Sequence, residues 1–324
     1  MTKKRRTVLK YGSSKRLMPE IFMIFHFILN PNSGKRKKQK ILEDAIKSAC
    51  RKRKLDYHIY YTTCPKDATE YVRSMVNSYK DRQRFVCVGG DGTLNEVVNS
   101  APCNPNVEFG VIPYGSGNDF VKNFGNIDDF YDINAQLDGT PVSLDLIKCN
   151  EYYCVNMVNI GFDCAVAKEA GKLKFFSPKA SYILGVIKVF FRKIGTKMKI
   201  TFDDGTVIDD NLTLTAIGNG KYCGGGFMAA PLANTSDGIF DVCVIKKVTR
   251  RRFLRLVGIY KKGLHVNNPK AEKHISYHRC SHLKMEFHAP IPICIDGEIM
   301  GAKRVDLTVI RNAFNFIIPK NKNQ

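Results

Sequence analysis

The chain has eleven cysteines but no C-x-x-C pair, and the cysteines are scattered from Cys50 to Cys294. Zinc sites and disulfide frameworks both rely on characteristic cysteine spacings, so neither is expected. Several cysteines, such as Cys87 and Cys243, lie inside apolar stretches typical of buried strands. The pattern indicates reduced, buried thiols, as in a cytoplasmic protein.

Long apolar runs are also absent, since no stretch reaches the roughly 20 residues that a membrane-spanning helix needs. The longest run near the N-terminus, residues 21–29, contains His26. Basic residues precede this run as in a signal peptide, but Asn-Pro-Asn-Ser-Gly-Lys follows it instead of a cleavage pattern. We therefore expect no membrane span. The run is predicted to form the first sheet strand, and residues 1–22 are predicted to form a basic, disordered tail.

Acidic residues are scarce: the chain has 30 of them against 51 lysines and arginines, which leaves a net charge of +21. Nucleic-acid binding would explain this charge, but the sequence has no helix-turn-helix, zinc-finger or RNA-binding motif and no tryptophan. Residues 171–200 combine basic with aromatic residues and contain no acidic one. That combination suits the surface of an anionic membrane, so we expect a peripheral membrane protein that does not bind nucleic acid.

A second basic segment, residues 246–262, has the pattern of an amphipathic helix. A membrane surface would suit this pattern. An ordinary helix with its apolar side packed inward and its arginines in water would suit it equally well, so the sequence leaves both interpretations open.

The first part of the chain alternates strand-like and helix-like stretches, which are strands at 25–29, 57–61, 85–88 and 109–112 and helices at 39–53, 68–79, 94–100 and from residue 119. Such alternation predicts a doubly wound α/β domain with a parallel sheet. From about residue 141 the pattern changes to short strands at 142–148, 152–159, 198–202, 211–218, 239–246, 282–287, 293–296 and 305–309. We expect these to form a mostly antiparallel β-sandwich.

A glycine-rich turn, Gly89-Gly90-Asp91-Gly92-Thr93, joins the apolar run 85–88 to the helix-like stretch 94–99. Glycines allow backbone N–H groups to approach an anion, and the following helix N-terminus favours negative charge. Asp91 can hold a divalent cation against the same phosphates. The turn therefore predicts a nucleotide site.

Two further loops follow strands in the same way, at residues 30–34 and 113–119. Because ligands of open α/β sheets bind outside the carboxyl ends of the strands, we expect all three loops to meet at one site. Asp67 and Glu70 have the spacing of a capping box that opens a helix, which places Thr62 in a loop beside the same crevice.

These motifs, together with Gly218-Asn219-Gly220, Gly224 to Gly226, Ala230-Pro231, Asp237-Gly238 and Asp296-Gly297-Glu298, resemble the bacterial diacylglycerol kinase and related lipid kinase family, whose relatives include sphingosine kinases. The resemblance runs from about Met23 to Pro319. It implies a nucleotide-binding α/β domain at 23–140, a β-sandwich domain at 141–310 and a segment, 311–324, that returns to the first domain. Because family members tend to begin just before the first strand, Met23 is a candidate start.

The resemblance also implies the reaction, which is transfer of the γ-phosphoryl group of ATP to a lipid hydroxyl in an interdomain cleft. Glu298 matches the glutamate proposed as general base in the family, and Asp91 is the second predicted catalytic residue. The nucleotide would be bound by Asn30, Pro31, Asn32, Ser33, Gly34, Thr62, Gly89, Gly90, Asp91, Gly92, Thr93, Leu94, Asn95, Ser116, Asn118 and Asp119.

Besides the Mg²⁺ carried by ATP, the resemblance implies a second, structural Mg²⁺ bound by the Asp237 carboxylate and the backbone carbonyls of Asn234 and Ile239. Asp145 is expected to link this metal to the cleft. Some members carry a further acidic residue where this chain has Ser236, so the metal site is expected to be weaker here.

Diacylglycerol is the expected acceptor on the family resemblance alone, in phospholipid metabolism. Ceramide, a sphingoid base and phosphatidylglycerol remain open, because acyl chains are recognised by area and shape. An NAD kinase shares the glycine-rich turn, and a non-catalytic lipid-binding protein would share the fold. The sequence does not determine the oligomeric state, with a homodimer among the expected assemblies, and the expected location is the cytoplasm at the membrane surface.

Overall fold

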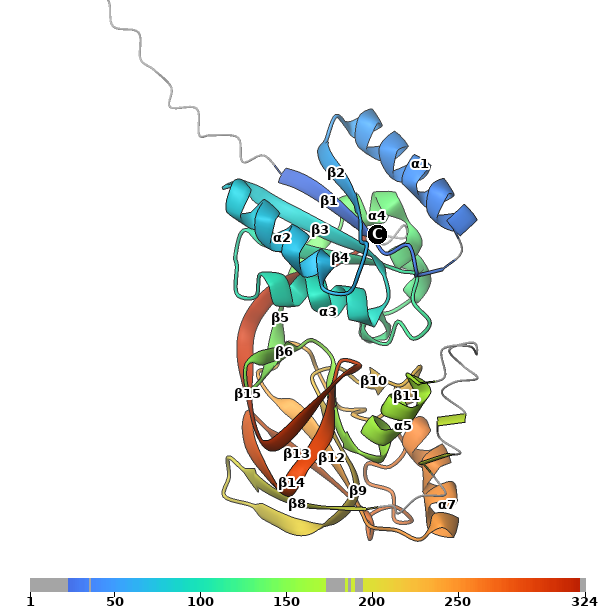
Figure 1. Cartoon of the computed structure of the whole chain (residues 1–324), viewed down its shortest axis with the longest axis vertical. Helices are drawn as coiled ribbons and strands as arrows, with labels where there is room; N and C mark the ends of the chain where they lie inside the picture. The colour runs from blue at the N-terminus through green and yellow to red at the C-terminus, as the bar shows by residue number, and fades with distance from the viewer. Residues whose placement is uncertain (1–22, 35, 173–183, 186–187, 190–194, 321–324) are drawn as a thin grey trace, which may run out of the picture.

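The computed structural model describes residues 23–34, 36–172, 184–185, 188–189 and 195–320. Two domains are stacked along the long axis of the molecule, with the N-terminal domain above the C-terminal domain in Figure 1. The predicted basic tail, residues 1–22, lies outside the described residues. So does much of the predicted membrane segment at 171–200.

The N-terminal domain is built on four parallel strands in the order β2-β1-β3-β4. The bounds of these strands are β1 (Met23–Leu29), β2 (Asp56–Tyr61), β3 (Arg82–Gly89) and β4 (Val107–Pro113). The helices are α1 (Arg36–Arg53), α2 (Asp67–Ser78), α3 (Asp91–Ser100) and α4 (Ile133–Leu137). Helices α2 and α3 pack on one face of the sheet, and α1 and α4 on the other. Because both faces are covered, β3 and β4 are buried along nearly their whole length, and the predicted doubly wound domain is confirmed.

Two local predictions in this domain are wrong. The helix expected from residue 119 is replaced by two 3₁₀ helices, η1 (Phe120–Phe124) and η2 (Ile127–Tyr131), before α4 begins. Gly125 has φ 95°, outside the helical range, and ends the helical stretch after the five residues of η1. An α-helix starting at residue 119 is therefore not formed.

The predicted capping box at Asp67 and Glu70 is also absent. Helix α2 begins after Lys66, which has φ 69° and makes no side-chain cap. The Asp67 carboxylate instead accepts the backbone N–H and the hydroxyl of Thr63 and the hydroxyl of Tyr60, so it closes the loop after β2. Thr62 still lies in this loop, as expected.

The C-terminal domain consists of antiparallel strands and helices α5 (Phe162–Ala170) and α7 (Arg250–Lys261). The strands are β5 (Thr140–Cys149), β6 (Tyr152–Cys154), β7 (Met157–Gly161), β8 (Thr196–Phe202), β9 (Val207–Gly218), β10 (Tyr222–Cys223), β11 (Phe227–Met228), β12 (Phe240–Lys246), β13 (Ile275–Cys280), β14 (His282–Ile295) and β15 (Glu298–Ile318). One apolar core lies between the strands, and a second lies where α5 and α7 cover β7, β9 and β12.

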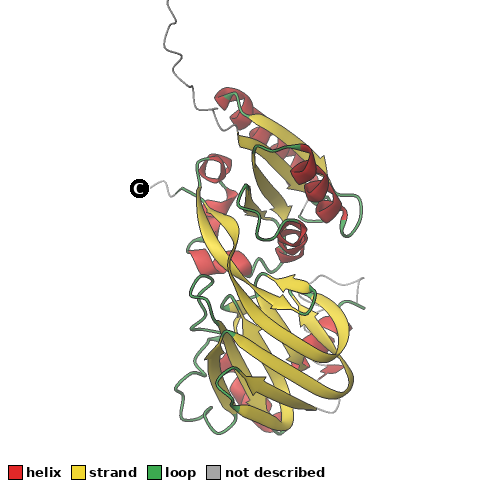
Figure 2. Cartoon of the chain, turned by 90° about the vertical axis from the view of Figure 1, so that its left-hand side faces the viewer, coloured by secondary structure: helices red, strands yellow, loops and turns green. Residues whose placement is uncertain are grey.

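The domains are joined by the 21-residue strand β15, which runs from the C-terminal domain into the N-terminal domain (Figure 2). Its first half pairs with β14, while Asn315 and Phe316 pair in parallel with β4. The register against β5 shifts between Ile310 and Phe314. The predicted strand at 305–309 and the predicted returning segment from residue 311 are thus parts of one strand, and the expected boundary falls at its bulge.

The second basic segment forms helix α7, whose Phe253, Leu256 and Tyr260 side chains are buried. The apolar side of the helix therefore packs inward. Leu254, in contrast, is 59% exposed. No helix in the described part of the chain combines the length and the hydrophobicity needed to cross a bilayer.

Candidate active site

The N-terminus of α3 is open at the carboxyl end of β3. Gly90 is the N-cap residue and provides no side-chain cap. The first intrahelical bond runs from the Leu94 N–H to the Gly90 carbonyl at 3.1 Å, so the amides of Asp91, Gly92 and Thr93 precede it. Such amides have no partner within a helix and can bind an anion.

The three predicted loops meet at this helix end. The Asn30 amide donates to the Thr93 hydroxyl at 3.2 Å, which ties the loop after β1 to the start of α3. The loop after β4 approaches even more closely. A Cβ atom added to Gly115 would lie 2.4 Å from the Gly90 Cα atom. Only glycine fits at such a backbone-to-backbone contact.

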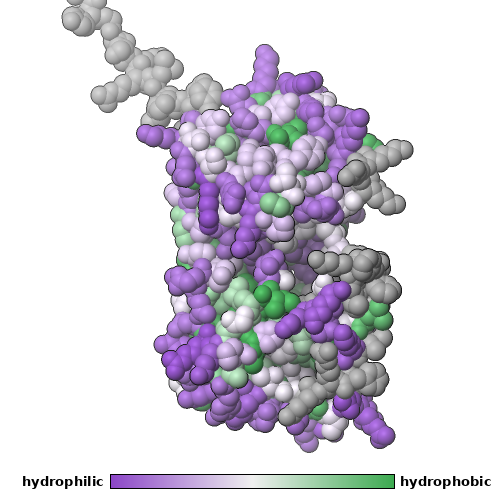
Figure 3. Space-filling model, viewed as in Figure 1, coloured by the Kyte–Doolittle hydropathy of each residue, from purple (hydrophilic) through white to green (hydrophobic). Residues whose placement is uncertain are grey.

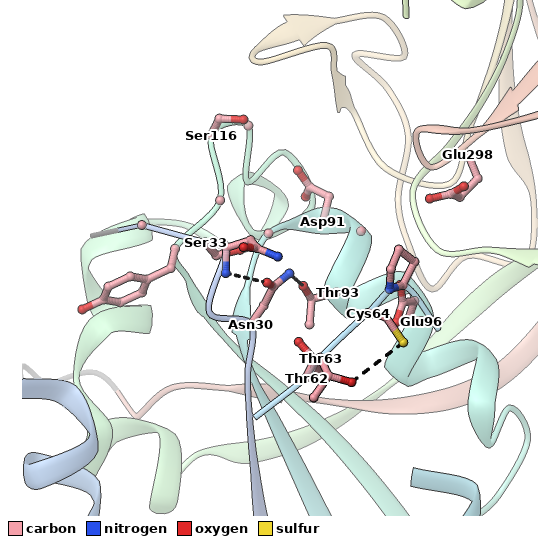
Figure 4. A pocket seen from close by; sticks show the side chains of 18 residues that line it. Asn30, Ser33, Thr62, Thr63, Cys64, Asp91, Thr93, Glu96, Ser116 and Glu298 are labelled. Carbon is pink, nitrogen blue, oxygen red and sulfur yellow. Dashed lines mark hydrogen bonds between the residues drawn. The ribbon is translucent and has the colours of Figure 1, made fainter. Parts of the chain in front are cut away.

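The loops form one wall of a pocket of about 820 Å³, and the C-terminal domain contributes Glu298 on another side (Figure 4). The pocket is lined by Asn30, Asn32, Ser33, Gly34, Thr62, Thr63, Cys64, Pro65, Gly90, Asp91, Gly92, Thr93, Glu96, Tyr114, Gly115, Ser116, Gly117 and Glu298. Three lining residues are acidic, and among the side chains that the structure describes no lysine or arginine lines the pocket. The basic run 35–38 lies outside those described side chains. The acceptors and amides present could hold a nucleotide with its cation.

Asp91 lies between this pocket and a smaller cavity of about 110 Å³ at the domain interface. Its two carboxylate oxygens accept the N–H groups of Asp119 and Phe120, each at 3.1 Å. Burial raises the pKa of Asp91, and the nearby Asp119 and Asp296 carboxylates add to the rise. Each oxygen keeps a second lone pair, with which Asp91 can still bind a cation.

Glu298 is exposed at the start of β15 and is positioned by the turn that precedes it. Asp296 in this turn has φ 47°, and its carboxylate accepts the backbone N–H groups of Val155, Asn156 and Met157 at 2.6–3.0 Å. It also accepts from the Asn95 amide at 2.8 Å. These bonds tie the turn to both domains and thereby hold Glu298 at the cleft. They also explain why the predicted strand 152–159 is split into β6 and β7.

Glu96 is a pocket residue that the sequence analysis missed. Burial raises the pKa of its carboxyl group, and the Glu298 carboxylate contributes to the rise, so the two acidic groups lie near each other in the cleft. The available signal was its position three residues after Thr93 on α3, because residues at this spacing share one side of a helix.

Several predicted nucleotide residues do not line the pocket. Leu94 is buried in the core, Gly89 ends β3, and Pro31 lies in the loop after β1. Asn118 is buried and donates to the carbonyls of Pro113 and Gly115. These residues shape the loops from behind, and direct contact with a nucleotide remains a prediction for them.

Two other predicted residues connect the domains. The Asn95 amide reaches the Asp296 carboxylate, as described above. Asp119 accepts the backbone N–H of Gly225 at 2.7 Å and pairs with Lys122 at 2.5 Å. Both residues therefore hold the two walls of the cleft together.

The residues predicted to bind a structural metal lie in the C-terminal domain. Asp237 Oδ2 is 2.6 Å from Arg279 Nη2, and the Asn234 side chain accepts from Ser236. Asp145 accepts the Gly238 N–H at 2.8 Å. The described residues contain no cluster of three or more histidine, cysteine or acidic side chains arranged to hold a metal ion.

Comparison with known proteins also divides the chain into two parts, but it places β5 with the N-terminal part. The sequence model of the diacylglycerol kinase catalytic domain matches residues 25–149, and that of the YegS C-terminal NAD kinase beta sandwich-like domain matches residues 156–318. The diacylglycerol kinase of Bacillus subtilis (strain 168) is 26% identical over 299 residues, which cover 91% of this chain and 96% of the relative.

A second relative, the probable lipid kinase YegS-like of Shewanella frigidimarina (strain NCIMB 400), is 31% identical over 247 residues, which cover 74% of this chain and 77% of the relative. The crystal structure of a putative diacylglycerol kinase from Bacillus anthracis str. Sterne has a similar fold. It superimposes with a TM-score of 0.74 at 23% identity and covers 95% of this chain and 99% of that one.

Proposed function

The chain belongs to the diacylglycerol kinase family and is a lipid kinase that uses ATP, and from this premise we propose that it phosphorylates diacylglycerol with Mg-ATP to give phosphatidic acid. The reaction would serve phospholipid metabolism. Diacylglycerol is favoured because relatives that match nearly the whole chain are named for it.

The pocket is the observation that carries the proposal. Its loops offer backbone amides at the α3 N-terminus, which suit phosphate oxygens. Its three acidic side chains would repel a bare triphosphate, so a cation bound to the nucleotide would favour binding there. Mg²⁺ bound to ATP would supply that charge. Asp91, with a lone pair free on each oxygen, is the proposed protein contact of Mg-ATP.

Glu298 is the proposed general base. Phosphoryl transfer runs through a loose transition state, so the protein mainly positions the two reactants and accepts a proton. The lipid hydroxyl oxygen bonds to the γ-phosphorus, the bond from that phosphorus to the β-γ bridging oxygen breaks, and ADP leaves. The hydroxyl proton passes to the Glu298 carboxylate. The exposed position of Glu298 at the cleft supports this role.

The lipid would reach the cleft from a membrane surface beside the C-terminal domain. Figure 3 shows apolar surface on this domain just below the cleft, whereas the N-terminal domain is mostly hydrophilic on the same face. Exposed leucines of the C-terminal domain include Leu232, Leu254 and Leu264. Leu254 lies among the arginines of α7, and this mixture supports binding to anionic lipid.

We further propose a homodimer, which sedimentation of the purified protein would test.

The activity is tested by transfer of ³²P from Mg-ATP to lipid in mixed micelles. Diacylglycerol, ceramide, a sphingoid base and phosphatidylglycerol are supplied separately, with NAD as a soluble acceptor and the Glu298→Gln variant as control. We expect labelled phosphatidic acid with the wild type and its loss with the variant. Another labelled lipid would change the substrate assignment. A folded protein that labels no acceptor would contradict the proposed reaction.

A further inference from the structure

The loop before β12 gathers negative charge in the C-terminal domain. It contains Asp237, and Asp241 follows in β12 itself. The Asp241 side chain is fully buried, whereas that of Asp237 is 24% exposed. Asp145 anchors the same loop, since its backbone N–H donates to the Thr235 carbonyl and its carboxylate accepts from Gly238. Buried carboxylates of this kind need positive charge or hydrogen-bond donors nearby.

Arg279 supplies that charge. It lies in β13 directly opposite Asp241 in the antiparallel register, which directs both side chains to the same face of the sheet. Its Nε atom is 3.4 Å from Asp241 Oδ1, and its Nη2 atom is 2.6 Å from Asp237 Oδ2. One guanidinium group thus donates a hydrogen bond to Asp237 and forms a longer ion pair with Asp241, two contacts that the planar fork of arginine can make together.

A second arginine lies at the other side of the loop. A Cβ atom added to Gly238 would be 2.1 Å from Arg311 Nε and 2.4 Å from its Cζ atom, so this guanidinium group packs against the Gly238 backbone. Gly238 has φ 77°, which also favours glycine. The acidic loop is therefore flanked by two permanent cations that the chain itself provides.

These residues do not fit the structural Mg²⁺ that the family resemblance implies. Mg²⁺ takes oxygen ligands at about 2.0–2.1 Å in near-ideal octahedral geometry. The available protein ligands are one carboxylate and two carbonyls, with Ser236 where some members have an acidic residue, so waters would complete the coordination and Asp237 alone would supply the negative charge. The Asp91 and Asp237 carboxylates both already accept hydrogen bonds, but at Asp237 one donor is the Arg279 guanidinium group, whose positive charge would repel a divalent cation beside it.

We propose that Arg279 is the resident cation of the Asp237 and Asp241 loop in place of a divalent metal. The C-terminal domain then folds without bound Mg²⁺. As a consequence that rests on the proposed function, the Mg²⁺ requirement of the kinase is confined to the ion that arrives with ATP.

Thermal unfolding of the full chain without nucleotide tests this proposal. We expect the same Tm in EDTA and in millimolar Mg²⁺ for the wild type. Arg279→Met leaves two carboxylates without their cation and should lower Tm by roughly 4–8 °C in both buffers. Arg279→Lys keeps the charge but loses the bridging fork, so its Tm should fall between those of the wild type and Arg279→Met.

Arg304→Met is the matched control. Arg304 lies in the same domain, but its side chain is 81% exposed and forms a surface ion pair, with its Nε atom 3.6 Å from Glu286 Oε1. We expect a change of less than about 2 °C there. The proposal is overturned if Mg²⁺ raises the wild-type Tm above its value in EDTA and Asp237→Asn removes that rise, or if Arg279→Met is as stable as Arg304→Met. The wild-type comparison decides even if Arg279→Met does not fold. These readouts do not use kinase activity, so they stand whatever the acceptor assay gives.

Discussion

The two acidic loops of this kinase differ in the source of the positive charge that balances them. In the N-terminal domain, the loop at Asp91 faces an open pocket with Glu96 and Glu298 nearby and no described basic side chain along the lining. In the C-terminal domain, the loop at Asp237 is closed by Arg279. The first loop is thus suited to a cation that arrives with a substrate, and the second to structural stability. Acidic residues in one protein can thus bind a substrate's cation or stabilise the fold, depending on which charged side chains surround them.

The largest expected difference between the loops is in turnover. Glu298→Gln removes the proposed proton acceptor and should lower kcat by about 10²–10⁴-fold while leaving Tm close to the wild-type value. Asp237→Asn should do the reverse, with a Tm lower by several degrees and a kcat within a few-fold of the wild type. Kinase assays and thermal unfolding of both variants measure this. Loss of stability without loss of turnover in Glu298→Gln would reverse the assignment.

A smaller effect should follow from adding a side chain at Gly115, where the loop after β4 contacts the backbone of Gly90. Gly115→Ala places a methyl group within 2.4 Å of the Gly90 Cα atom, so one of the two loops must move. We expect the Tm to fall by several degrees and the KM for ATP to rise, because the amides of α3 and the loop after β4 no longer share one geometry. Gly258→Ala in α7 is the control, since an added Cβ there meets nothing within 4 Å and the residue lies outside the pocket lining. Equal KM values for ATP in the two variants would contradict the proposal that the loops at Gly90 and Gly115 form one nucleotide site.

The smallest predicted effect concerns Asp163, a partly buried acidic residue that lies neither in the proposed Mg-ATP pocket nor in the loop paired with Arg279. Asp163 lines an apolar pocket below α7, and burial raises its pKa to about 6 against an ordinary value of 3.8, while the Tyr260 hydroxyl opposes the rise. Because the folded state holds this proton more tightly than the unfolded state, the contribution of Asp163 to stability falls as pH rises from 3.8 to about 6 and stays lower above that.

Asp163→Asn should remove this dependence. Between pH 5 and pH 7.5 the wild type should lose about 1 kcal/mol of unfolding free energy that the variant retains. Urea unfolding at the two pH values measures the difference. Parallel losses in both proteins would assign the pH dependence to other groups, of which Asp241, with a pKa of about 6, is the first to examine.

Local patterns predicted much of the N-terminal domain. The repeated strand and helix periods predicted the doubly wound sheet. One glycine-rich turn and two loops with Gly, Asn, Ser or Asp, each after a strand, were predicted to meet, and they do so in one pocket. The helix expected from residue 119 stops at Gly125, a break that the local sequence contains and the prediction did not use. No local pattern, however, contains the contact that fixes the start of this stretch, in which the Asp91 carboxylate, 28 residues before Asp119, accepts the N–H groups of Asp119 and Phe120.

The C-terminal domain depended more on distant pairing. The 21-residue strand β15 was predicted only as a short stretch, because half of it pairs in one domain and its end in the other. Arg279 was not singled out at all, since only the register between β12 and β13 places it opposite Asp241. Glu298 was found through the family resemblance, and the acidic turn that holds it became clear only from the contacts of Asp296.

The most direct test of the contrast between the loops is the thermal response of one nucleotide-free sample to Mg²⁺ alone, to a non-hydrolysable ATP analogue alone and to both together. We predict no change with Mg²⁺ alone and the largest rise in Tm with Mg²⁺ and the analogue together, because only the nucleotide brings the cation into the Asp91 pocket. A rise with Mg²⁺ alone that equals the rise with both would contradict the account.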